Sequence, residues 1–153
     1  PSRSSAASDV YKRQRRESWI VFTENKKQAK EFNKIINTKG FKSALYNTDL
    51  DSEERLENLN KFKKADLNVL VTCTALDEGF DMPEADGALI LSASSSKRQR
   101  VQRMGRVLRI TENKPNALIV TVYSSKTEFD KLMEEAKRYH KEGVPVSWKR
   151  QDR

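Results

Sequence analysis

The chain has 153 residues, a formal net charge of +8 and a hydrophobic content of 36%. This length suits one domain with one core, and the basic balance favours nucleic acid or another polyanion as partner. No apolar run approaches the length of a membrane span, and Cys73 is the only cysteine, which excludes an internal disulfide framework. We therefore expect an intracellular protein with no membrane partner.

The first residues differ in origin from the rest. Residues 4–14 match, over eleven successive positions, the conceptual translation of a transposon adaptor used in sequencing libraries. We interpret 1–14 as a non-native, disordered tail and expect the true N-terminus to be missing. The tail carries Arg3, Lys12 and Arg13 against Asp9, a contribution of +2, so +6 of the total +8 remains.

A strand and a helix open the folded part. Residues 19–22 form a short apolar run of β-forming residues, which predicts a buried strand. Thr23 or Asn25 can cap the helix that follows, and Gly40 is a plausible stop. The predicted apolar face of this helix consists of Ala29, Phe32, Ile35 and Ile36.

A weaker strand at 43–46 precedes a second helix, whose start resembles a capping box made by Asp51 and Glu54. We expect its inward face to consist of Leu56, Leu59 and Phe62. The later predicted strands are 68–73, 88–91 and 117–123. A closing helix spans 128–141, with the surface residue His140 and the better-buried side chains Phe129, Leu132, Met133 and Tyr139.

An arginine-rich helix is predicted over 97–109, capped by one of the serines at 94–96. At about 100° per residue, Gln102, Arg106 and Arg109 fall within about 60° of each other. Val101, Met104 and Leu108 gather on a different side, which can dock the helix on a sheet. The first group aims two planar guanidinium forks at one point, an arrangement that suits phosphate.

The alternation of strands and helices predicts a parallel sheet covered on both faces. In such a sheet ligands bind at the carboxyl ends of the strands, where the loops after Phe22, Cys73 and Leu91 should emerge. Beyond Gly143, the stretch 144–148 is interpreted as an edge strand or the beginning of a lost continuation.

Two segments resemble motifs of superfamily 2 helicases. Residues 102–109 match the Q-R-x-G-R-x-x-R pattern of motif VI, and 69–83 resemble motif V with its E-G-x-D-x-P core. They occur in the family's order and at a similar separation. The resemblance covers roughly 18–140 and is to the second, C-terminal RecA-like domain of DEAD/DEAH-type helicases. It implies a three-layer α/β RecA-like (P-loop NTPase-like) domain with a mostly parallel sheet over 17–142, followed by a truncated tail at 143–153.

The resemblance also implies residue roles. Arg106 and Arg109 correspond to catalytic arginine fingers that reach the γ-phosphate, while the ATP-binding positions are Gln102, Gly79 and Asp81. Thr23, Thr72 and Thr74 correspond to contacts with the nucleic-acid backbone. For Thr72 and Thr74 the alternative is an ordinary strand-end hydroxyl. Many relatives carry Thr where this chain has Cys73, and Arg103 turns away from the Gln102 side of the helix.

The nucleotide site is expected to be incomplete. The chain has neither a G-x-x-x-x-G-K-[ST] loop nor a separate D-E-x-x box, and Asp77-Glu78 lies inside the motif V segment. We therefore assign no metal ligand and expect ATP with Mg²⁺ to be bound mainly by a missing first RecA-like domain. This chain alone is predicted to be inactive as an ATPase.

The predicted function is that of a second motor domain of a helicase or translocase that grips single-stranded DNA or RNA, in the cytoplasm or associated with the nucleoid. Gln102 stands where DEAD-box RNA helicases have His, which favours DNA. Two alternatives remain: a nucleic-acid-binding module that never used ATP, and a non-catalytic RecA-like scaffold for a partner protein.

Overall fold

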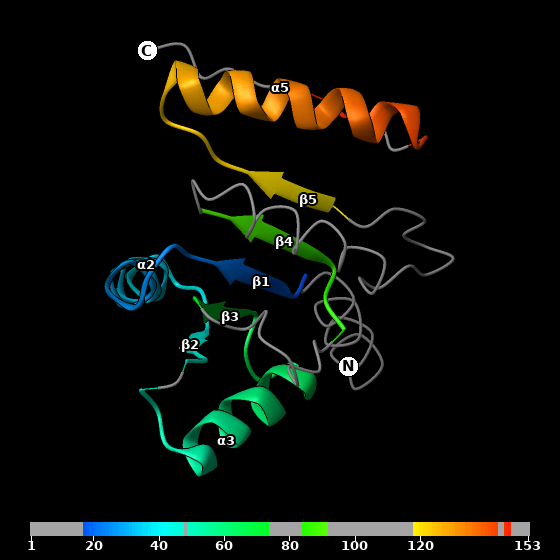
Figure 1. The fold of residues 1–153 in the computed structure, drawn as a ribbon. Coiled ribbons are helices and arrows are strands. Elements are labelled where there is room, and N and C mark those ends of the chain that lie inside the picture. Colours follow the sequence, from blue (N-terminus) through cyan, green and yellow to red (C-terminus); the bar gives the residue numbers. More distant parts are fainter. Residues whose placement is uncertain (1–16, 48, 74–83, 92–117, 144–145, 148–153) are drawn as a thin grey trace. The chain divides into compact units, whose positions relative to one another are not determined.

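The computed structural model describes residues 17–47, 49–73, 84–91, 118–143 and 146–147, within two compact units, 1–122 and 123–153. The first unit contains a five-stranded sheet in the order β2-β3-β1-β4-β5, with every neighbouring pair parallel (Figure 1). The predicted parallel sheet is confirmed. Its strands are β1 (Trp19–Phe22), β2 (Ser43–Leu45), β3 (Val69–Thr72), β4 (Gly87–Ile90) and β5 (Leu118–Thr121).

The predicted strands are found with small shifts at their ends. β1 has the predicted bounds, whereas β2, β3 and β5 are shorter than predicted and β4 begins one residue earlier. A close contact with the neighbouring strand requires glycine at this first position of β4. Gly87 is opposite Trp19 in the register, and a Cβ placed on it would lie 2.7 Å from the indole ring. Only glycine lets Trp19 lie this close to β4.

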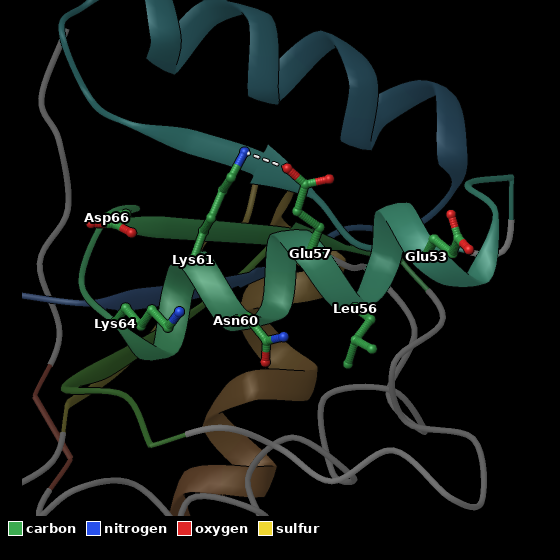
Figure 2. A pocket seen from close by; sticks show the side chains of 7 residues that line it. All are labelled: Glu53, Leu56, Glu57, Asn60, Lys61, Lys64 and Asp66. Carbon is green, nitrogen blue, oxygen red and sulfur yellow. Dashed lines mark ion pairs between the residues drawn. The ribbon is translucent and has the colours of Figure 1, made fainter.

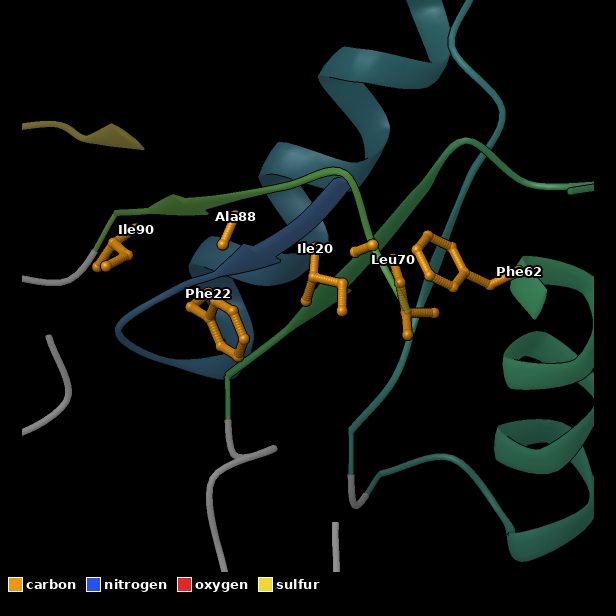
Figure 3. Close-up of a cluster of buried hydrophobic side chains, with 7 residues drawn as sticks. Ile20, Phe22, Phe62, Leu70, Ala88 and Ile90 are labelled. Carbon is orange, nitrogen blue, oxygen red and sulfur yellow. The ribbon is translucent and has the colours of Figure 1, made fainter. Parts of the chain in front are cut away.

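Side chains of the sheet alternate between two hydrophobic clusters. On one face Ile20 and Phe22 pack with Leu70, Ala88 and Ile90. Helix α3 (Ser52–Lys63) contributes Phe62 to this cluster, as Figure 3 shows. On the other face Val21, Val69 and Val71 pack against Ala29 of helix α2 (Lys26–Thr38). Both faces are therefore covered by helices, as predicted.

The ends of α2 follow from its sequence. Asn25 is the N-cap, because its side-chain oxygen accepts a hydrogen bond from the Gln28 amide at 2.8 Å. At the other end Gly40 has φ 93°, and its amide donates to the carbonyl of Asn37 at 3.1 Å. The Phe41 amide donates to the Ile36 carbonyl at 3.1 Å, which completes a Schellman motif. The predicted stop is confirmed, and Asn25 is the cap.

Two apolar side chains predicted to face inward do not. Ile35 is 52% exposed and Leu56 is 58% exposed, so both assignments were wrong. On α3, Leu59 and Phe62 contact the sheet, and Leu56 lies about 120° from Phe62 around the helix. On α2, Ile36 contacts the sheet, and Ile35 is about 100° away from it. Each of these two residues thus lies at the margin of its helix's apolar stripe, outside the part that packs on the sheet.

The second unit contains helix α5 (Lys126–Lys141), which begins two residues before the predicted start. Ser125 caps it, because its hydroxyl oxygen accepts a hydrogen bond from the Glu128 amide. The Glu128 carboxylate in turn accepts from the Ser125 amide, which completes a capping box. The rings of Tyr123 and Phe129 lie 5.2 Å apart. Leu132 is buried and His140 exposed, as predicted, but the burial of Glu135 was not anticipated.

Part of the predicted C-terminal stretch is described: residues 146 and 147 form no strand, while 144, 145 and 148 lie outside the described residues. No helix in the described ranges combines the length and apolar character needed to cross a membrane.

Candidate functional site

Three polar residues follow or end neighbouring strands at the carboxyl edge of the sheet. Thr23 is the first residue after β1, Asn47 is the second residue after β2, and Thr72 is the last residue of β3. All three are buried, with exposures of 1%, 2% and 0% respectively. Because the strands are parallel and β3 lies between β2 and β1, these side chains meet at one edge. This is where ligands bind in open α/β sheets.

Thr23 joins the ends of two strands. Its amide donates to the Thr72 carbonyl at 2.8 Å, and its hydroxyl lies 3.3 Å from that carbonyl and 3.2 Å from the Asn25 carbonyl. The hydroxyl is therefore within hydrogen-bonding distance of the end of β3 and of the residue that caps α2. Through these contacts the buried Thr23 hydroxyl holds the end of β3 close to the start of α2.

Thr72 and Asn47 carry buried polar atoms that have no hydrogen-bond partner among the described residues. These atoms are the Thr72 hydroxyl oxygen and the Asn47 amide nitrogen Nδ2. The other side-chain atom of Asn47, Oδ1, accepts a hydrogen bond from the Asp49 amide at 3.1 Å, which makes an Asx turn. A buried donor without a partner costs about 1–3 kcal/mol, so each is a candidate contact for a ligand.

An ion pair joins the first turn of α2 to the loop that follows β2. Lys26 Nζ, in the first turn of α2, lies 2.6 Å from Asp49 Oδ1, and both side chains are 43% exposed. The hydrogen bond from Lys26 lowers the pKa of Asp49 below its ordinary value of 3.8, and the charges of Lys26 and Lys30 act in the same direction. Desolvation opposes the shift. Asp49 is therefore held as an anion among lysines.

The structure brings together two of the predicted site residues, Thr23 and Thr72. The others, Thr74, Gly79, Asp81, Gln102, Arg106 and Arg109, lie outside the described residues, as does the arginine-rich segment 97–109. Sequence reasoning did not identify Asn47, Lys26 or Asp49. A signal for Lys26 was present, because two lysines open a helix that has no acidic residue in its first turn.

A separate hollow lies on the surface of α3. Its open shape and exposed charged side chains, including the Lys61–Glu57 ion pair at 3.0 Å, give it no buried polar group to orient a ligand (Figure 2). The residues around it are Glu53, Leu56, Glu57, Asn60, Lys61, Lys64 and Asp66. Within the described ranges, no three histidine, cysteine or acidic side chains gather as metal ligands.

A five-stranded parallel sheet with helices on both faces is a three-layer α/β architecture, the class to which RecA-like domains belong. The chain belongs to the helicase conserved C-terminal domain family, whose model matches residues 3–111. That match spans both the segment resembling motif V and the segment resembling motif VI.

Curated relatives support the same class. The chain is 33% identical over 119 residues to the DNA 3′-5′ translocase XPB2 of Sulfurisphaera tokodaii, covering 78% of the chain and 26% of that protein. It is 32% identical over 100 residues to UvrABC system protein B of Aliivibrio fischeri, covering 62% of the chain and 15% of that protein. The chain thus spans about a quarter or less of the length of these relatives.

Solved structures show the fold. The C-terminal domain of the DEAD-box protein Dbp5 superimposes with a TM-score of 0.68 at 21% identity, covering 90% of the chain and 78% of that domain. The Hef helicase domain of Pyrococcus furiosus gives a TM-score of 0.60 at 21% identity, covering 86% of the chain and 27% of that structure. The chain therefore has the fold of the second RecA-like domain of a superfamily 2 helicase.

Proposed function

We propose that this chain is the second motor domain of an ATP-dependent nucleic-acid helicase or translocase. The observation that carries the proposal is the family match over 3–111, because it includes both motif-like segments. The order of elements adds support, since the motif V segment begins with β3. The carboxyl end of this strand lies between the start of α2, with Lys26, and the loop that contains Asp49.

In this proposal Arg106 and Arg109 act as arginine fingers on ATP held mainly by a first RecA-like domain. Bidentate guanidinium donors stabilise the charge that develops on the γ-phosphate as it is transferred. Gln102, Gly79 and Asp81 contact the nucleotide or border the cleft. We assign Mg²⁺ to the first domain, because this chain contains no phosphate-binding G-x-x-x-x-G-K-[ST] loop of its own.

The carboxyl edge is the proposed nucleic-acid contact. Thr72 has a hydroxyl without a partner among the described residues, which leaves it a donor for a backbone phosphate. Thr23 positions the edge through the bonds of its hydroxyl, and Thr74 is the other backbone contact that the motif resemblance implies. We propose DNA as the nucleic acid, because Gln102 replaces the His of DEAD-box proteins and XPB2 is named a DNA translocase.

The catalytic part is tested after the domain is placed behind an intact first domain. Arg106→Lys and Arg109→Lys keep the charge but lose the planar fork. We expect each to lower DNA-stimulated ATP turnover by about a hundredfold or more, as expected for loss of a transition-state donor, with little change in DNA affinity without nucleotide. The 153-residue chain alone should show no ATPase above background.

Arg103→Lys is the matched control, because it makes the same substitution on the other side of the predicted helix. It should reduce turnover only slightly. Equal losses from all three substitutions, or losses mainly in DNA binding, would show that the helix is a basic binding face without a catalytic role.

A further inference from the structure

The start of α2 has an unusual charge distribution. Its first turn contains Lys26 and Lys27 and no acidic residue, whereas the first turns of α3 and α5 contain Glu53, Glu54 and Glu128. The N-terminus of a helix carries a partial positive charge, which acidic side chains stabilise and lysines do not. The first turn of α2 therefore supplies no carboxylate from within the helix.

A carboxylate from the loop after β2 pairs with the first lysine of this turn. Asp49 follows β2, and its carboxylate accepts a hydrogen bond from Lys26 at 2.6 Å. Because β3 lies between β2 and β1, this ion pair spans the carboxyl end of β3, where Thr72 ends the strand. Lys30, one turn further along α2, adds a second positive charge that acts on the same carboxylate.

The turn that carries Asp49 also holds an unused donor. Asn47 is 2% exposed, and its Oδ1 accepts the Asp49 amide while its Nδ2 has no partner among the described residues. Two lysines at the start of α2 thus lie near a loop that holds a side-chain carboxylate and a buried amide nitrogen without a partner among the described residues. Lys26 and the spare donor of Asn47 are the groups of this cluster that a further anion could use.

We propose that Asp49 is an internal competitor of the nucleic-acid backbone: its carboxylate occupies Lys26 in the free protein and is displaced when a phosphate binds across the end of β3. The phosphate and the carboxylate are both anions attracted to the same ammonium group, and they repel each other, so binding of the phosphate weakens the pair between Asp49 and Lys26. The exchange is feasible because a half-exposed ion pair contributes little free energy and is screened by salt. This inference rests on the proposed nucleic-acid-binding function.

The test measures binding of the 153-residue chain to fluorescent oligo-dT over a range of salt concentrations. Asp49→Asn removes the competing charge and leaves the backbone bond to Asn47 in place. We expect affinity at low salt to rise about two- to fivefold. The logarithmic salt slope should steepen by about 0.7, because in the wild-type chain the cation taken up by the displaced Asp49 carboxylate offsets the counterion released from one phosphate of the single strand. In a Lys26→Gln background, Asp49→Asn should have no such effect.

Glu57→Gln is the matched control, because it removes one carboxylate from the Lys61 ion pair on α3 and changes the net charge equally. It should give a clearly smaller gain and an unchanged slope. If Asp49→Asn gives the same result as Glu57→Gln, or weakens binding, the competition is wrong while the proposed function stands. If the wild-type chain does not bind oligo-dT, both proposals fail.

Discussion

The starts of α2 and α3 use the same local capping chemistry and opposite charges. Asn25 accepts from the Gln28 amide at 2.8 Å, and Asp51 accepts from the Glu54 amide at 2.7 Å. The first turn of α3 then carries two glutamates, while that of α2 has no acidic residue. The difference shows that capping is decided within four residues, whereas the charge around a helix start can be supplied by a distant loop.

The largest effect in this comparison should come from removing the caps. Asn25→Ala and Asp51→Ala leave one backbone amide without its acceptor, so each should lower the free energy of unfolding by about 1 kcal/mol, within a range of about 0.5–2. Urea denaturation of the chain measures it. Serine at either position keeps a hydroxyl acceptor and should recover most of the loss. If alanine and serine behave alike, the side-chain bond is not what stabilises the helix start.

A smaller effect should come from exchanging charges between the two helix starts. Lys27 is exposed, and Lys27→Glu places an anion near the positive end of α2. It should raise the free energy of unfolding by about 0.3–1 kcal/mol at low salt and weaken binding to single-stranded DNA. Glu53→Lys on α3 should lower stability by a similar amount without weakening DNA binding. Added salt should shrink both stability changes; persistence at high salt would contradict a dipole effect.

The smallest effect concerns Asp49 and pH. Its pKa in the folded chain lies below the ordinary value of 3.8 because of the hydrogen bond from Lys26. A carboxyl whose pKa is lowered by folding stabilises the fold fully above its ordinary pKa, and this contribution is lost as pH falls through the folded value. The difference in stability between wild type and Asp49→Asn should therefore be constant near neutral pH and shrink only in strongly acidic solution. Denaturation over a pH series measures it, and a difference that changes between pH 6 and 8 would implicate a different group.

The sequence predicted the sheet better than the site. β1 appears with the predicted bounds, and the strands shifted by one or two residues, because short runs of β-forming residues end where polar or glycine residues begin. Of the site, the sequence placed Thr23 and Thr72 at strand ends, and the structure joins them through the hydroxyl of Thr23 at 3.3 Å. The roles of Gln102, Arg106 and Arg109 rest on the motif resemblance and remain predictions, since these residues lie outside the described ranges.

By itself the sequence determined the features that depend on a few neighbouring residues. Asn25 and Asp51 start helices, and Gly40 ends one because glycine adopts a positive φ without steric cost. Alternation of strands with helices also determined that the sheet is parallel, since a crossover connection returns the chain to the end of the sheet where the previous strand began.

Only the tertiary structure decided which strands are neighbours and which side chains they bring together. The order β2-β3-β1 places the loops after β1 and β2 on either side of one strand end, so Lys26 and Asp49 meet although 23 positions separate them in the chain. The packing of α2 and α3 leaves Ile35 and Leu56 exposed. Periodicity identifies the apolar side of a helix, but how much of that side is covered depends on the width of the surface it meets.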